Sequence, residues 1–371
     1  MQSIDIPNSV TSIGDLTFEC STSLRSIDIP NSINKIGYGI FNGCTSLQSI
    51  YIPESVTEIG NSVFYGCSAL ISIDIPFSVR SIGVNVFEDC TSLERINVSS
   101  DNLNYASIEG VLFNKDITRI IAYPKNVGGQ IYDIPNNVKL IHDKTFYSCS
   151  SLQKVTIPNS VEIIGKSAFE WCESLQNIDI NDGVTSVGDD AFAFCKSLRN
   201  IIFPDSITYI GEGVCHECAS LENIKILASV KTISAFAFSC CSTLKHIEIP
   251  HSVTRIEAEA FEGCESLEEI ILPENLNFIG FKAFCACSSL QDINIPSTVK
   301  KIETLAFWEC TSLNSIHIHY MDLNEIDFEN RIFEDIDFEN CTLYIPSGTR
   351  WAYRHHPIFS QFKNIITERQ K

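Results

Sequence analysis

Hydrophobic and polar residues follow a short pattern that returns every 23 residues along most of the chain. In one copy of this pattern, Ile50 and Ile52 flank Tyr51, so the two isoleucines point the same way. A period of two over a β-branched stretch predicts a short β-strand. Pro53 ends the strand, because proline cannot donate a hydrogen bond to a continuing sheet. A fixed period of this length is typical of a solenoid, in which each repeat buries its apolar face against its neighbours.

The second half of each repeat places its apolar residues at wider spacing. In the same copy Val56 and Ile59 are three residues apart, and Gly60 follows them. We expect Gly60 to form a turn with positive φ, which glycine adopts without steric cost. Phe64 and Cys67 come next, and both positions recur at the same step in most repeats. Stacked repeats should therefore build continuous interior columns of leucine, isoleucine, valine, phenylalanine and cysteine.

The strand position occurs 14 times between Ile4 and Ile316. We therefore expect a solenoid of about 14 rungs, where a rung is one repeat of the coil. Short parallel β-strands should stack on one side, with turns and short helical segments on the other side. One continued period favours a single solenoid domain over residues 1–371.

Two segments interrupt the period. The step from Cys90 to Cys149 is 59 residues, and the segments 102–105 and 110–116 inside it predict a β-hairpin, followed by a strand in 117–123. The second interruption covers 320–340, after which a strand pattern returns. A final group of aromatic residues predicts a cap over the last rung, formed by Trp351, Tyr353, Phe359 and Phe362. The expected divisions are N-terminal repeats in 1–96, a hairpin insertion in 97–131, C-terminal repeats in 132–319, and an irregular segment with the cap in 320–371.

These repeats resemble a known family. The unit S-L-x-x-I-x-I-P-x-S-V-x-x-I-G-x-x-A-F-x-x-C is nearly unbroken from Val155 to Cys172, and it resembles the BspA-like leucine-rich repeats of Bacteroidales and some protozoa. Residues 105–124 look like that family's hairpin insertion, and residues 341–365 are similar to its C-terminal cap. The resemblance implies a leucine-rich-repeat solenoid. It also implies an adhesin at the cell surface or secreted from the cell, with a host or bacterial surface protein as its partner.

The composition bears on location and partners. The chain has 26 basic and 46 acidic residues, a net charge of −20, which disfavours binding to nucleic acid or to anionic lipid. No apolar run approaches the ~18 residues of a spanning helix, so we expect no direct membrane insertion. The first residues, Met1 to Asp5, lack the basic and apolar segments of a signal peptide.

The sixteen cysteines allow three interpretations. Twelve follow the step of 23 residues, with Cys20 one place early in the series. We favour free thiols that pack as small buried hydrophobic groups, while disulfides between adjacent rungs or bound metal are the alternatives. Four cysteines lie outside the series and are the candidates for a reactive thiol: Cys215, Cys240, Cys285 and Cys341.

Two other patterns suggest metal chemistry, and packing explains both more simply. Cys215 and Cys218 form a C-x-x-C motif around His216, but they occupy the phenylalanine and cysteine positions of the repeat. His317 and His319 alternate on the last regular strand and should face outward together. A zinc site needs about four converging ligands, and no second C-x-x-C follows. We found no sequence motif of a known enzyme class, so we expect no catalytic activity, no metal and no cofactor.

The outward positions of successive strands should form one extended surface for ligand binding. This column is acidic near the N-terminus and includes exposed apolar residues further along, which strands facing only water seldom carry. The candidate ligand-binding residues are Asp28, Tyr51, Asp74, Asp179, Ile202, Lys225, Glu248, Ile271 and His317. We therefore expect a non-catalytic module that binds a protein partner. The alternative is a structural module that self-associates through the exposed strand around Ile4, since an unpaired strand edge invites pairing with another chain.

Overall fold

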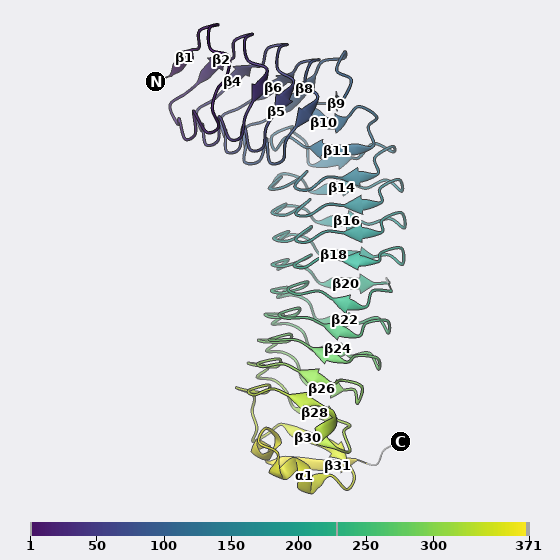
Figure 1. Ribbon diagram of the computed structural model, residues 1–371. Helices are drawn as coiled ribbons and strands as arrows, with labels where there is room; N and C mark the ends of the chain where they lie inside the picture. Colours follow the sequence, from purple (N-terminus) through teal and green to yellow (C-terminus); the bar gives the residue numbers. More distant parts are fainter. Residues whose placement is uncertain (1, 228, 369–371) are drawn as a thin grey trace. The chain divides into compact units, whose positions relative to one another are not determined.

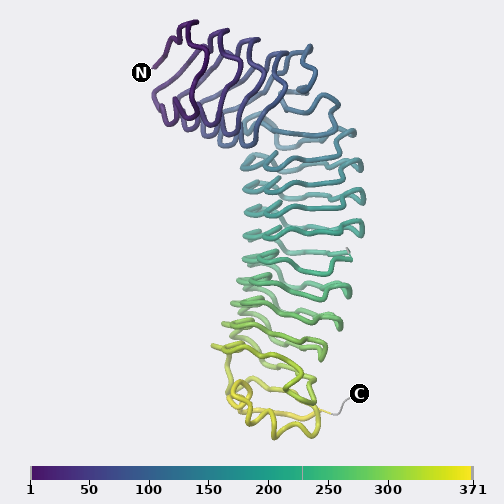
Figure 2. The backbone as a smooth tube through the Cα atoms, in the orientation of Figure 1, coloured from purple at the N-terminus to yellow at the C-terminus, as the bar shows by residue number. Residues whose placement is uncertain are grey.

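The computed structural model describes residues 2–227 and 229–368 (Figure 1). It consists of stacked rungs of short parallel strands and contains very little helix. The chain separates into two compact units, Met1–Glu173 and Ser174–Lys371. Within each unit, successive rungs lie side by side (Figure 2). The solenoid predicted from the repeat is confirmed.

In the first unit, the expected strands stack in parallel, and residues 23 positions apart lie opposite each other, as Ile4 does to Ile27. They are β1 (Ser3–Asp5), β2 (Ser26–Asp28), β4 (Ser49–Tyr51), β6 (Ser72–Ile75), β8 (Arg95–Val98), β12 (Ile131–Asp133) and β14 (Lys154–Thr156). We call the surface formed by the outward side chains of these strands, and of their counterparts in the second unit, the strand face.

A second set of two-residue strands lies further along each rung, around the position of Ile59. In the first unit these are β3 (Lys35–Ile36), β5 (Glu58–Ile59), β7 (Ser81–Ile82), β13 (Leu140–Ile141) and β15 (Ile163–Ile164). They also pair in parallel with a step of 23 residues, as Glu58 does with Ser81. The sequence pattern did not predict this second set, because the spacing of three between Val56 and Ile59 carries no period of two.

The hairpin insertion has the expected form. Strands β9 (Tyr105–Ile108) and β10 (Val111–Asn114) pair antiparallel, and β11 (Arg119–Ala122) continues as the third strand beside β10. β11 then pairs in parallel with β13, which returns the chain to the repeat.

The second unit continues the same plan. The first set of strands comprises β16 (Asn177–Asp179), β18 (Asn200–Phe203), β20 (Asn223–Ile226), β22 (His246–Glu248), β24 (Glu269–Ile271), β26 (Asp292–Ile295), β28 (Ser315–Ile318), β30 (Thr342–Pro346) and β31 (Asn364–Glu368). The second set comprises β17 (Ser186–Val187), β19 (Tyr209–Ile210), β21 (Thr232–Ile233), β23 (Arg255–Ile256), β25 (Phe278–Ile279), β27 (Lys301–Ile302) and β29 (Asp327–Phe328). β30 is the strand whose pattern returns after the second interruption, and β31 follows it, so two rungs add to the 14 of the repeat.

The helices lie outside the repeats: η1 (Leu323–Glu325) is in the second interruption, and α1 (Arg350–His355) and η2 (Phe359–Gln361) belong to the C-terminal cap. Tyr353, Phe359 and Phe362 are buried there as expected, and the Tyr353 hydroxyl donates to the carbonyl of Tyr320 at 3.0 Å. Trp351 is the exception. It is 74% exposed and stacks on a neighbouring histidine, so it does not cover the last rung.

Each described repeat turns without a helix, where we expected short helical segments. The turn contains two residues with positive φ, four positions apart, such as Ser62 (φ 54°) and Gly66 (φ 69°). Gly60, expected to have positive φ, does not. A Cβ on Gly60 would lie 2.9 Å from the carbonyl carbon of Gly37, so this glycine is needed for the close approach of two rungs.

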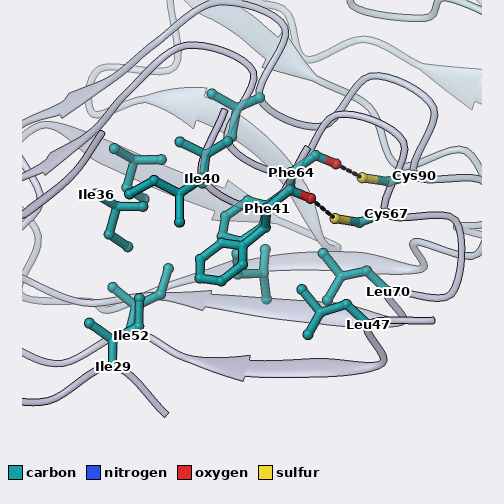
Figure 3. Close-up of a cluster of buried hydrophobic side chains, with 14 of the residues drawn as sticks. Ile29, Ile36, Ile40, Phe41, Leu47, Ile52, Phe64, Cys67, Leu70 and Cys90 are labelled. Atoms are coloured by element: carbon teal, nitrogen blue, oxygen red, sulfur yellow. Dashed lines mark hydrogen bonds between the residues drawn. The ribbon is translucent and has the colours of Figure 1, made fainter. Parts of the chain in front are cut away.

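The interior is formed by stacked columns of identical side chains (Figure 3). Phe41 and Phe64 stack with ring centroids 5.8 Å apart. The Cys67 thiol donates to the carbonyl of Phe41 at 3.2 Å, and the Cys90 thiol donates to the carbonyl of Phe64 at 3.0 Å. The same contact recurs along the column at Cys44, Cys172, Cys218, Cys264, Cys287 and Cys310. The cysteine position is thus a buried hydrogen-bond donor as well as a small apolar group.

Candidate binding surface

The first unit places three candidate residues side by side on the strand face. Asp28 pairs in register with Tyr51, and the Tyr51 side chain is 56% exposed. Asp74 is exposed on the next strand and accepts a hydrogen bond from the Asn97 side-chain amide at 2.8 Å. Tyr51, Asp74 and Asn97 line a shallow hollow of about 340 Å³ together with Glu54. This part of the strand face is acidic with one exposed aromatic ring.

The second unit carries the apolar part of the strand face. Ile202 is 48% exposed and lies in register with Lys225, while Ile271 is 62% exposed and lies in register with Glu248. Asp179 is exposed on β16. Each exposed isoleucine therefore sits beside a charged side chain of the neighbouring rung.

A hollow of about 710 Å³ lies over β18, β20 and β22. Ile202, Lys225 and Glu248 line it, together with Leu227 and His251. The sequence analysis missed Leu227, which is exposed and enlarges the apolar surface beside Ile202. The sequence could have indicated this residue, because Leu227 occupies the position that proline fills after most strands.

A second hollow of about 410 Å³ lies beside Ile271 and is lined by Glu269, Asp292 and Asn294. Its surroundings are mostly acidic and polar.

His317 is less accessible than the other candidates. It is half-buried, and its ring stacks on Tyr344 of β30 with centroids 4.3 Å apart. Its Nε2 lies 3.4 Å from a carboxylate oxygen of Asp292, and its Nδ1 lies 3.7 Å from one of Glu368. His319 contacts a different group, the Asn294 side chain, at 2.6 Å. The two histidines do not converge, and no group of three or more potential metal ligands occurs among the described residues.

The C-x-x-C motif is part of the interior. Cys215 and Cys218 are both buried, and the Cys218 thiol donates to the carbonyl of Phe192 at 3.1 Å. Burial raises the pKa of Cys215 well above its ordinary value. The carbonyl of Cys215 in turn accepts a hydrogen bond from the Cys241 thiol at 3.3 Å. The motif thus continues the interior columns of the neighbouring rungs.

The sixteen cysteines are free thiols, and the four candidates for a reactive thiol are not the most exposed of them. Of the four candidates outside the series, Cys215, Cys285 and Cys341 are buried and Cys240 is half-buried. Cys20 is exposed. It does not belong to the interior column, because it occupies the second positive-φ position of its turn, where later rungs have Gly43 and Gly66.

The repeat matches a family model described as BspA type leucine-rich repeat region, over residues 1–118, 126–245 and 231–350. A comparison with curated protein sequences finds no match. No helix among residues 2–227 and 229–368 is long and apolar enough to cross a membrane.

Solved structures of bacterial repeat proteins share the fold. A leucine-rich repeat protein from Bacteroides ovatus is 28% identical with a TM-score of 0.62, over 100% of this chain and 84% of that chain. One from Eubacterium ventriosum is 25% identical with a TM-score of 0.59, over 91% of this chain and 83% of that chain. The pneumococcal vaccine antigen PcpA is 20% identical with a TM-score of 0.50, over 94% of this chain and 68% of that chain, and this similarity concerns the fold alone.

Proposed function

Since the chain belongs to the BspA-type leucine-rich repeat family, we propose that it is a non-catalytic module that binds a protein partner through its strand face. The family resemblance further favours an adhesin that acts at the cell surface or after secretion. The observation that carries the proposal is the hollow around Ile202, where apolar and charged side chains share one accessible surface.

The chemistry of this surface resembles that of protein interfaces. Ile202 and Ile271 are exposed apolar side chains on strands, and Leu227 is exposed directly after β20. Side chains that are already ordered lose little conformational entropy when a partner binds. Lys225 and Glu248 lie beside them and can orient a partner by charge. Protein interfaces typically combine an apolar centre with a polar rim in this way.

A direct test compares two substitutions of the same type on different surfaces. Ile202→Asp adds a charge to the strand face, and Ile163→Asp adds one to an exposed isoleucine of the second set of strands. A phage-displayed library of natural protein domains would be selected on the wild-type chain, and each bound domain would then be titrated against both variants. We expect at least a tenfold weaker affinity for Ile202→Asp and no change for Ile163→Asp. Equal affinities for all three chains, with unchanged circular dichroism, would contradict the proposal.

A second candidate function is self-association. β1 is the outermost strand of the sheet β1-β2-β4, and no strand among residues 2–227 and 229–368 pairs with its outer edge, which can therefore pair with another chain.

A further inference from the structure

Backbone hydrogen bonds join each rung to the next on the side of the turns. The amides of Ser62, Phe64 and Gly66 donate to carbonyls of the following rung at 2.9, 3.1 and 2.8 Å. The acceptors are at alternate positions of that rung, among them Val86 and Glu88. The pattern of three alternate donors recurs in the second unit, as at Glu259, Phe261 and Gly263.

The pattern stops where the hairpin insertion begins. The next three alternate amides, those of Asn85, Phe87 and Asp89, donate to no acceptor among residues 2–227 and 229–368. On the far side of the gap, the carbonyl of Thr145 accepts from the amide of Tyr123 at 3.0 Å, so the inserted chain occupies only part of the missing rung.

A pocket of about 280 Å³ lies at this place, and we call it the insertion pocket. Its lining includes Val84, Phe87, Ala122, Tyr123 and Tyr147. Phe87 is only partly buried, whereas Phe41 and Phe64 of the regular rungs are 0% exposed. The phenylalanine column therefore presents an uncovered ring to the pocket.

Two of the lysines that line the pocket form ion pairs. The Lys144 ammonium lies 2.9 Å from Oε1 of Glu88, and the Lys125 ammonium lies 2.9 Å from a carboxylate oxygen of Asp89. The Glu88 side chain is only 7% exposed, yet its Oε2 accepts no hydrogen bond from any described residue. This oxygen has less than 1 Å² of accessible surface, so a ligand in the pocket does not reach it.

We propose that the insertion pocket binds a peptide segment of a protein partner, in which one aromatic or aliphatic residue covers Phe87. The carbonyls of the segment would accept from the amides of Asn85, Phe87 and Asp89, as the next rung does elsewhere in the repeat. This site lies on the side of the turns and is independent of the strand face.

A peptide fits the pocket better than a simple anion or cation does. The lining contains three lysines, and two of them, Lys125 and Lys144, are already paired with Asp89 and Glu88. The uncovered groups are backbone donors and an aromatic ring. A peptide offers carbonyls and an apolar side chain at the spacing of a polypeptide, which matches both.

The test uses N-acetyl-phenylalanine amide as the probe and N-acetyl-glycine amide as its control. Both are titrated into the full-length, isotopically labelled chain, and amide shifts are followed by NMR. We expect saturable shifts at Asn85, Phe87 and Asp89 with the phenylalanine probe, at millimolar affinity as suits one residue. The glycine probe should produce no saturable shift. Absence of saturation with both probes, or equal shifts with both, would overturn the proposal.

A substitution in the lining provides a second test. Val84→Trp should be tolerated by the fold, because Tyr38 and Phe281 show that the same position of the repeat accepts a large ring. That ring should close the pocket and abolish the shifts with the phenylalanine probe. Unchanged shifts would overturn the proposal.

Discussion

At the scale of single residues, the repeat selects side chains by both shape and hydrogen bonding. Cysteine fits the interior column because its thiol is small and can donate to the carbonyl of a phenylalanine on the preceding rung, as Cys67 does. The spacing of residues predicted the burial of this column. It could not reveal the hydrogen bond, which depends on where the carbonyl points. It also misassigned Cys20, since one residue of offset moves a side chain from the interior to the surface.

The thiols should differ sharply in reactivity. Burial raises the pKa of Cys44 to about 11 and that of Cys90 to about 12, so almost no reactive thiolate is present in these groups near pH 8. Cys20 is exposed and should react first with a thiol reagent, and half-buried Cys240 should follow more slowly. Cys20→Ser should abolish the fast phase, and all sixteen thiols should react after unfolding. Several fast thiols in the native Cys20→Ser chain would contradict this order.

Removing one ring from the phenylalanine column should destabilise the chain strongly. Phe261 is 0% exposed and stacks between Phe238 and Phe284, at centroid distances of 5.6 and 5.4 Å. Phe261→Ala should lower the free energy of unfolding by about 3–5 kcal/mol, because it leaves a cavity. The exposed Asp179 provides the control, and Asp179→Ala should change it by less than about 0.5 kcal/mol. Similar shifts of the denaturation midpoint in both variants would refute the assignment of interior and surface.

At the scale of elements, a local pattern predicted the first strand of each rung. It predicted neither the second, two-residue strand nor the form of the turn. Alternation around Tyr51 and the following Pro53 defined that strand, because both signals act within a few residues. The two-residue strands such as β5 form through pairing with other rungs, so their own sequence carries little signal. The turns do contain local bonds, such as that from the amide of Cys67 to the carbonyl of Phe64, but alternate amides bond to the next rung instead. That competition prevents the helical segments we expected.

The last element of the second set should be sensitive to acid. Glu329 follows β29 and lies 2.7 Å from the Lys301 ammonium, and it accepts from the backbone and hydroxyl of Thr304 at 3.0 and 2.8 Å. The hydrogen bonds from Lys301 and Thr304 lower the pKa of Glu329 to about 2, from an ordinary value of 4.5. A lowered pKa stabilises the fold above about pH 4.5, and this stabilisation is lost as the pH falls toward 2.

The measurement is unfolding by denaturant at several pH values between 6 and about 2. Glu329→Gln should lower the denaturation midpoint near pH 6 and show a smaller decrease toward acid than the wild type. Glu339→Gln is a suitable control, because the Glu339 side chain is 73% exposed and its distance to Lys363 is 3.7 Å. An identical pH dependence in wild type and Glu329→Gln would show that this carboxylate does not contribute.

At the scale of the whole molecule, the period predicted which side chains form the strand face and which form the interior. The candidate residues Tyr51, Ile202 and Ile271 are exposed as the period requires. The hollows beside them could not be predicted, because they depend on how the side chains of three neighbouring rungs lie together. The insertion pocket could not be predicted either. It arises where an inserted segment replaces a rung and leaves the amides of Asn85, Phe87 and Asp89 without an acceptor among the described residues.

The first rung supplies a final test, which concerns association between copies. Ile4 and Ile6 are only partly buried, whereas Ile27 and Ile29, one rung later, are each 2% exposed. The end of the interior columns is therefore open to solvent beside the free edge of β1, and covering it with a second copy would bury apolar surface. We expect the mass from light scattering to rise with concentration. The double variant Ile4→Glu and Ile6→Glu should then remain monomeric, because it places charges at that end. Ile163→Glu should behave like the wild type, since it alters an exposed isoleucine elsewhere. A wild-type mass equal to one chain at every concentration would exclude this mode of assembly and leave binding of a different partner as the function of the chain.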